Sequence, residues 1–201
     1  MVSKKSSLII AAIVTIFSFI TVAYVSCSKK GKNLNVCENV VCQNGGYCYV
    51  DTPAYIPVCV CPTGYEGTNC ETQSVLKFLA TWNMRQVDTG SDSATSIGRV
   101  YQYTVNLTAT ATPTTFFIGN LSNYYLYNDI ICTVDSVPNT RHFFIDTISA
   151  THMLYDNYKL LYGYGDINSA GDTIRGTFAV MHLSPTTNWV HDTFTITMTH
   201  L

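Results

Sequence analysis

Apolar and polar residues alternate with period two through most of the chain beyond Leu76. In one such run Tyr101, Tyr103, Val105 and Leu107 are separated by polar residues. Because successive side chains of a strand point to opposite faces, this pattern predicts strands with one apolar face and one wet face. About eight segments fit the pattern: roughly 78–87, 99–110, 114–119, 129–135, 142–148, 158–166, 171–182 and 190–199.

Clusters of turn residues separate these segments, for example Asp88-Thr89-Gly90 and Asn168-Ser169-Ala170-Gly171. Short strands of this kind, joined by short connections, must bury their apolar faces against one another. The pattern therefore predicts a mainly β domain, folded as an antiparallel eight-stranded barrel or sandwich.

The N-terminus carries a different pattern, an apolar run from Leu8 to Val25 that follows Lys4 and Lys5. A basic start followed by an apolar stretch is typical of a secretory signal. The ending Ala23-Tyr24-Val25-Ser26-Cys27 resembles a bacterial lipoprotein signal, which implies that Cys27 is acylated and becomes the mature N-terminus. An uncleaved signal helix is the alternative, since about 18 apolar residues just cross a hydrocarbon layer of about 30 Å. Ordinary cleavage without lipid is the third possibility.

Six cysteines gather between Cys37 and Cys70, with gaps of four, five, ten, one and eight residues. An even, closely spaced set behind an export signal is a disulfide framework for an oxidising compartment. So small a unit cannot bury enough apolar surface to hold itself together, and bridges supply the deficit. The spacing alone leaves about fifteen pairings open.

This spacing, with Cys42-Gln43-Asn44-Gly45-Gly46-Tyr47-Cys48 in front and Cys59-Val60-Cys61-Pro62-Thr63-Gly64-Tyr65 behind, resembles an EGF-like module. The resemblance implies three bridges: Cys37–Cys48, Cys42–Cys59 and Cys61–Cys70. Calcium-binding modules of this kind carry an acidic residue just before the first cysteine. Val36 stands there and cannot ligate through its side chain, so we expect no calcium site.

The start Lys77-Phe78-Leu79-Ala80-Thr81-Trp82 and the ending His191-Asp192-Thr193-Phe194-Thr195 resemble a lipocalin-like β domain found behind EGF-like modules in bacterial surface lipoproteins. The resemblance brings no catalytic residue with it. We expect four parts: a lipoprotein-type signal peptide at 1–26, a flexible tether at 27–36, an EGF-like domain at 37–71 and a lipocalin-like barrel at 72–201.

Catalysis finds little support in the pattern of titratable residues. The histidines lack the spacing of a zinc-binding pair, and His191 and Asp192 are adjacent, so they point to opposite faces of a strand. His182 shares a strand face with Phe178 and Val180. This position is more typical of a hydrogen-bonded histidine at the edge of a sheet than of a metal ligand. Glycoside hydrolysis would need two carboxylates across a cleft. The aspartates fall mostly at loops or strand ends, and nothing in the sequence pairs them.

Charge and aromatic content indicate which classes of binding partner are compatible with the chain. A net charge of −2 with 12% charged residues excludes the basic surface that a nucleic-acid-binding protein needs. Tyr124, Tyr125 and Tyr127 form a candidate binding patch, because tyrosine offers flat apolar area with a polar tip. The alternative is that these tyrosines fill or cover the barrel, as Tyr155, Tyr158, Tyr162 and Tyr164 would.

We therefore expect a non-enzymatic binding or adhesion protein of the cell envelope, without metal or cofactor, held on the outer membrane through Cys27. Its expected partner is a glycan or an envelope protein. A carrier of a small apolar ligand inside the barrel is the first alternative, and a single-pass membrane protein with an extracellular interaction domain is the second.

Overall fold

The computed structural model describes residues 36–201 except 94, 122–129, 137, 148–157 and 184–187. All the described strands belong to the compact unit Val40–Leu201. The apolar run 8–25 and Cys27 lie outside the described residues. Among the residues that are described, we find no helix with the length and apolar character needed to cross a bilayer.

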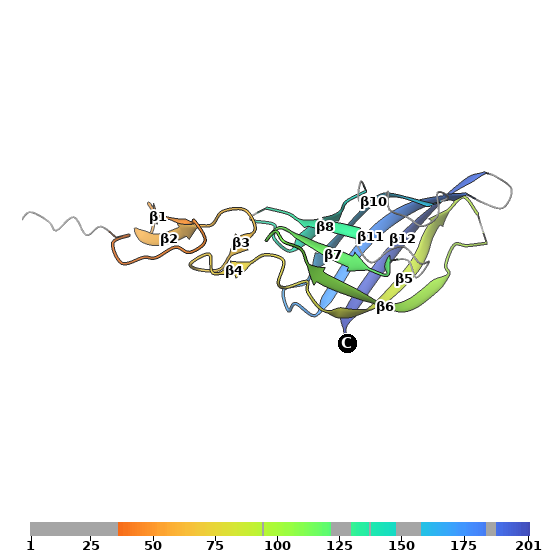
Figure 1. The fold of residues 1–201 in the computed structure, drawn as a ribbon, viewed down its shortest axis with the longest axis horizontal. Coiled ribbons are helices and arrows are strands. Elements are labelled where there is room, and N and C mark those ends of the chain that lie inside the picture. Colours follow the sequence, from red (N-terminus) through yellow and green to blue (C-terminus); the bar gives the residue numbers. More distant parts are fainter. Residues whose placement is uncertain (1–35, 94, 122–129, 137, 148–157, 184–187) are drawn as a thin grey trace, which may run out of the picture. The chain divides into compact units, whose positions relative to one another are not determined.

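Eight strands close into an antiparallel barrel in the order β10-β11-β12-β5-β6-β7-β8-β9 (Figure 1). The strands are β5 (Thr81–Ser91), β6 (Val100–Ala109), β7 (Thr115–Gly119), β8 (Ile130–Val134), β9 (His142–Ile145), β10 (Tyr158–Ile167), β11 (Thr173–Leu183) and β12 (Trp189–His200). The predicted mainly β class and the eight strands are confirmed, and the structure selects the barrel over the sandwich. Closure through the β12–β5 pair, from Asp192↔Ser91 to His200↔Trp82, leaves the barrel without a free edge.

The first barrel strand begins and ends later than its pattern predicted, so Asp88-Thr89-Gly90, expected as a turn, lies inside β5. Residues Ser74–Phe78 form turns, with the Phe78 N–H bonded to the Val75 carbonyl at 3.0 Å. Val75 and Phe78 are both buried in the core. Val75 and Phe78 therefore pack into the barrel core from a turn and not from a strand.

The barrel interior is filled at the end where β5 begins. Four aromatic side chains here are each 0% exposed: Phe78, Trp82, Phe116 and Phe143. The centroid of the Phe78 ring lies 5.2 Å from that of Phe116 and 5.3 Å from that of Phe143. Further along the interior lie Met84, Val105, Ile118, Cys132, Phe178 and Ile196. Cys132 is a buried free thiol in this core and behaves as a small hydrophobe.

Two facing glycines let the barrel wall accommodate these large side chains. Gly165 pairs with Gly176 across β10 and β11. A Cβ added to Gly165 would lie 2.5 Å from the Phe143 ring, and one added to Gly176 would lie 2.1 Å from the Tyr164 carbonyl oxygen. Only residues without a Cβ fit at these positions.

The cysteine-rich module has two small sheets, β1 (Tyr47–Asp51) with β2 (Ile56–Val60), and β3 (Tyr65–Glu66) with β4 (Thr72–Gln73). Cys42 is bonded to Cys59 and Cys61 to Cys70, two of the pairs that the EGF-like resemblance implied. Cys37 and Cys48 are also in disulfide form, which gives the region three bridges.

Candidate binding sites

Polar side chains occupy the interior of the barrel beyond its aromatic floor. Gln86 is 0% exposed, Asp88 2% and Asp192 8%. Tyr103 donates a hydrogen bond to Gln86, and His182 forms an ion pair with Asp192. We call these five residues the inner polar cluster.

Strand periodicity places the cluster inside. On β5, Gln86 and Asp88 follow Trp82 and Met84 at intervals of two residues, and all four are buried. On β12, Asp192 shares the inner face with Phe194. Polar groups at core-facing positions are exceptional, because burying them costs free energy unless they find partners.

Asp192 has partners on both carboxylate oxygens. Ser91 Oγ donates to Asp192 Oδ1 at 2.5 Å, and His182 Nδ1 lies 3.1 Å from Asp192 Oδ2. The side chain of His182 is 25% exposed and that of Asp192 is 11% exposed. The cluster is therefore open to solvent on the side of His182 and closed on the side of Gln86.

Gln86 and Asp88 are satisfied only in part. Tyr103 Oη donates to Gln86 Oε1 at 2.5 Å, while Gln86 Nε2 has no hydrogen-bond partner among the described residues. Asp88 accepts a hydrogen bond from the Gly90 backbone N–H, while no described residue is a partner of its Oδ1. Each such buried, unsatisfied atom costs about 1–3 kcal/mol.

The cluster brings two carboxylates together that the sequence pattern did not pair. Burial raises the pKa of Asp88, and the negative charge of Asp192 raises it further, against the Gly90 N–H and Arg99. The expectation that the aspartates lie at loops or strand ends, with nothing to pair them, is wrong for Asp88 and Asp192. They lie on strands that are far apart in sequence and become close only when the barrel closes.

His191 and Asp192 point to opposite faces of β12, as their adjacency predicted. His191 faces outward and its Nδ1 lies 2.9 Å from Asp92 Oδ2, whereas Asp192 faces His182 inside. Adjacent residues thus take part in two separate pairs. His142 forms a third pair outside the barrel, with Asp166 at 2.8 Å.

A second candidate site is the β1–β2 hairpin of the cysteine-rich module. Its register sets Tyr47 opposite Val60 and Tyr49 opposite Val58. These four side chains lie on one face and are exposed by 63, 37, 51 and 42% respectively. Ile56, 50% exposed, extends the same face. We call these five residues the hairpin face.

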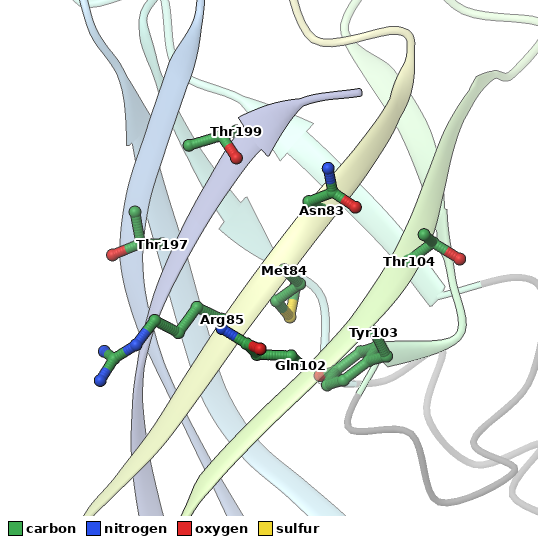
Figure 2. Close-up of a pocket in the computed structure, with 8 residues that line it drawn as sticks. All are labelled: Asn83, Met84, Arg85, Gln102, Tyr103, Thr104, Thr197 and Thr199. Atoms are coloured by element: carbon green, nitrogen blue, oxygen red, sulfur yellow. The ribbon is translucent and has the colours of Figure 1, made fainter.

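The third candidate is a hollow of about 470 Å³ on the outer wall of the barrel (Figure 2). Figure 2 shows the side chains of β5, β6 and β12 that line it: Asn83, Met84, Arg85, Gln102, Tyr103, Thr104, Thr197 and Thr199. Arg85 is its one charged residue. The outward-facing polar groups here are in contact with solvent, so none needs a ligand.

The tyrosines singled out by the sequence fall partly outside the structure. Tyr124, Tyr125, Tyr127 and Tyr155 lie outside the described residues, as does the proposed lipid-bearing Cys27. Tyr162 and Tyr164 lie on β10 and are 47 and 40% exposed, so these two do not fill the core.

Sequence reasoning missed both the inner polar cluster and the hairpin face. A signal for the cluster was present, since period-two alternation from Trp82 places Gln86 and Asp88 on the core side of β5. No family model matches the chain.

Proposed function

We propose that this chain is an exported, membrane-anchored binding or adhesion protein of the cell envelope, without enzymatic activity. In this proposal the cysteine-rich module is an EGF-like interaction unit, the barrel is lipocalin-like, and Cys27 carries the lipid anchor on the outer membrane. The hairpin face is the observation that carries the proposal.

The hairpin face has the properties of a docking surface. Folded domains rarely leave several neighbouring apolar side chains in water unless something covers them. Here Tyr47, Tyr49, Ile56, Val58 and Val60 are all exposed on one face of a two-stranded sheet. Tyrosine is also enriched among the residues that dominate protein interfaces.

Charge indicates what kind of partner fits. Residues 37–71 contain four acidic residues and no lysine or arginine; the acids are Glu38, Asp51, Glu66 and Glu71. Asp51 borders the hairpin face, because it is paired with Ile56 across the two strands. A second copy of the module or an anionic lipid surface would be repelled by this charge. The aliphatic residues Val58 and Ile56 favour an envelope protein with a basic rim over a glycan.

The test is a binding screen with the full chain, produced in an oxidising compartment, against purified envelope proteins and a glycan array. The double variant Tyr49→Thr/Val58→Thr keeps strand-forming residues while it removes apolar area. Tyr162→Thr, on the barrel wall, is the matched control because Tyr162 is also about half exposed. We expect a partner that the control binds and the double variant does not. A partner bound equally by both variants, or a screen without any partner, contradicts the proposal.

The anchor is tested separately by intact mass of the native protein. A mature chain that starts at Cys27 with added acyl mass supports the lipid anchor. An N-terminus at Met1 supports the single-pass alternative instead, and an unmodified Cys27 or Ser28 start supports ordinary cleavage.

A carrier of a small apolar ligand is the alternative function. Phe78, Trp82, Phe116 and Phe143 fill the barrel floor, and Gln86 and Asp88 lie on the interior beyond it. An apolar molecule seated against these two would leave the amide and the carboxylate without partners. The inner polar cluster therefore argues for a ligand of a different chemistry.

A further inference from the structure

We infer that the inner polar cluster is a second binding site, one that takes a hydroxyl-rich ligand such as a sugar ring or a cyclic polyol. The ligand would place hydroxyl groups between Gln86 Nε2 and Asp88 Oδ1. This site is independent of the hairpin face and of the lipid anchor.

The first argument concerns two buried polar atoms that make no hydrogen bond with a described residue. Gln86 and Asp88 are neighbours on the inner face of β5 and are 0 and 2% exposed. Within the described part of the chain, Nε2 of the amide and Oδ1 of the carboxylate have no hydrogen-bond partner. Nearly all buried polar atoms in folded proteins have a partner, so an occupant is expected at this place.

The second argument concerns which group satisfies both atoms at once. An amide nitrogen donates and a carboxylate oxygen accepts, and a hydroxyl group does both in return. An ammonium group would satisfy Asp88 and leave Gln86 open. A phosphate or carboxylate would satisfy Gln86 and be repelled by Asp88 and Asp192. Of these groups, only the hydroxyl leaves neither atom unpaired.

The third argument is the aromatic surface around the pair. Tyr101 lies directly opposite Gln86 on β6, and Phe194 lies opposite Asp88 on β12. Tyr103, which donates to Gln86, is packed against the same core. Flat apolar rings beside a few fixed polar groups are the combination that holds the faces and the hydroxyls of a sugar ring.

The fourth argument is access. Exposure rises from 0% at Gln86 and 2% at Asp88 to 25% at the His182 side chain. Asp192 is fixed between Ser91 and His182, so its oxygens are already engaged. A ligand therefore enters past His182 and Asp192, and its specific hydrogen bonds are made with the two residues behind them.

The experiment is a titration of the full chain with three sets of probes, followed by saturation-transfer NMR and by the melting temperature. The hydroxyl-rich set is glucose, galactose, N-acetylglucosamine and myo-inositol; ethanolamine is the ammonium probe and palmitate the apolar probe. We expect at least one hydroxyl-rich probe to bind. Gln86→Leu and Asp88→Asn should each weaken that binding at least tenfold.

Matched variants on the outer wall are the controls. Gln102→Leu makes the same Gln-to-Leu substitution on the exposed face of β6, and Asp166→Asn makes the same Asp-to-Asn substitution on β10. Both variants should bind the probe as the unaltered protein does. The inference is overturned if no hydroxyl-rich probe binds, if binding survives Gln86→Leu and Asp88→Asn, or if only ethanolamine or palmitate binds. A crystal structure with one buried water between the two atoms and no bound probe overturns it as well.

Discussion

The indole Nε1 of Trp82 donates a hydrogen bond of 2.9 Å to the carbonyl oxygen of Phe78, and both residues are completely buried. The bond joins the turn before β5 to the first inward residue of that strand. It therefore satisfies a buried carbonyl that no neighbouring strand reaches, and it closes the floor of the barrel.

Trp82→Phe should destabilise the barrel strongly. The substitution leaves the Phe78 carbonyl unpaired and opens a void in the floor, at a combined cost of about 2–4 kcal/mol. Urea denaturation monitored by far-UV circular dichroism measures the change. Trp189→Phe is the control, because Trp189 is 40% exposed and its loss should cost less than about 1 kcal/mol. Equal losses in the two variants would contradict this role of Trp82.

The stability of the barrel should depend on pH through Asp88. The folded state raises the pKa of Asp88, so between the unfolded and folded pKa values the folded protein holds a proton that the unfolded chain has lost. This contribution is fully present below the unfolded value of about 3.9 and is lost as pH rises through the folded pKa. Asp88→Asn should therefore gain stability over the unaltered protein at pH 7.5 and lose that advantage at pH 3.5.

Asp92 supplies the control of opposite sign. Its hydrogen bonds with the backbone and side chain of His191 lower the pKa of this exposed carboxyl. Its contribution is present above the unfolded pKa and is lost as pH falls, so Asp92→Asn should lower stability at pH 7.5 rather than raise it. Urea unfolding of both variants at the two pH values decides the matter, and a parallel response of both would refute the assignment.

Gly176→Ala should disrupt the pairing of β10 with β11. The new Cβ would lie 2.1 Å from the carbonyl oxygen of Tyr164, a backbone atom that cannot move without breaking the sheet. We expect a loss of about 1–3 kcal/mol or a failure to fold. Gly90→Ala is the matched control, since its Cβ meets nothing closer than 3.6 Å. Thermal melts of the two variants measure the difference.

Reduction should affect the two parts of the chain differently. The module depends on its bridges, each worth about 2–4 kcal/mol, whereas the described barrel contains a single free cysteine and a large apolar core. A phosphine reductant should therefore expose residues 37–71 to limited proteolysis, while the fluorescence of Trp82, measured in the Trp189→Phe variant, stays that of a buried indole. Concerted loss of both signals would show that the barrel needs the bridges.

Much of the fold could be predicted because it depends on local patterns. Alternation of the kind seen at Tyr101–Leu107 reports which face of a strand is apolar, and all eight strands were located from it within a few residues. Cysteine spacing likewise indicated a cross-linked module, because a unit so small has few other sources of stability. The start of β5 was misplaced because an apolar residue such as Phe78 can be buried from a turn as well as from a strand.

The candidate sites depended on tertiary structure. The sequence determined that Gln86 shares a strand face with Trp82, and that His191 and Asp192 face opposite ways, whereas it placed Asp88 in a turn. Only closure of the barrel between β12 and β5 decided that this face lies inside, and that Asp192 comes near Asp88 from about a hundred residues away. The physical reason is that periodicity fixes the direction of a side chain within its own strand, while its neighbours across the sheet are set by the pairing of distant strands.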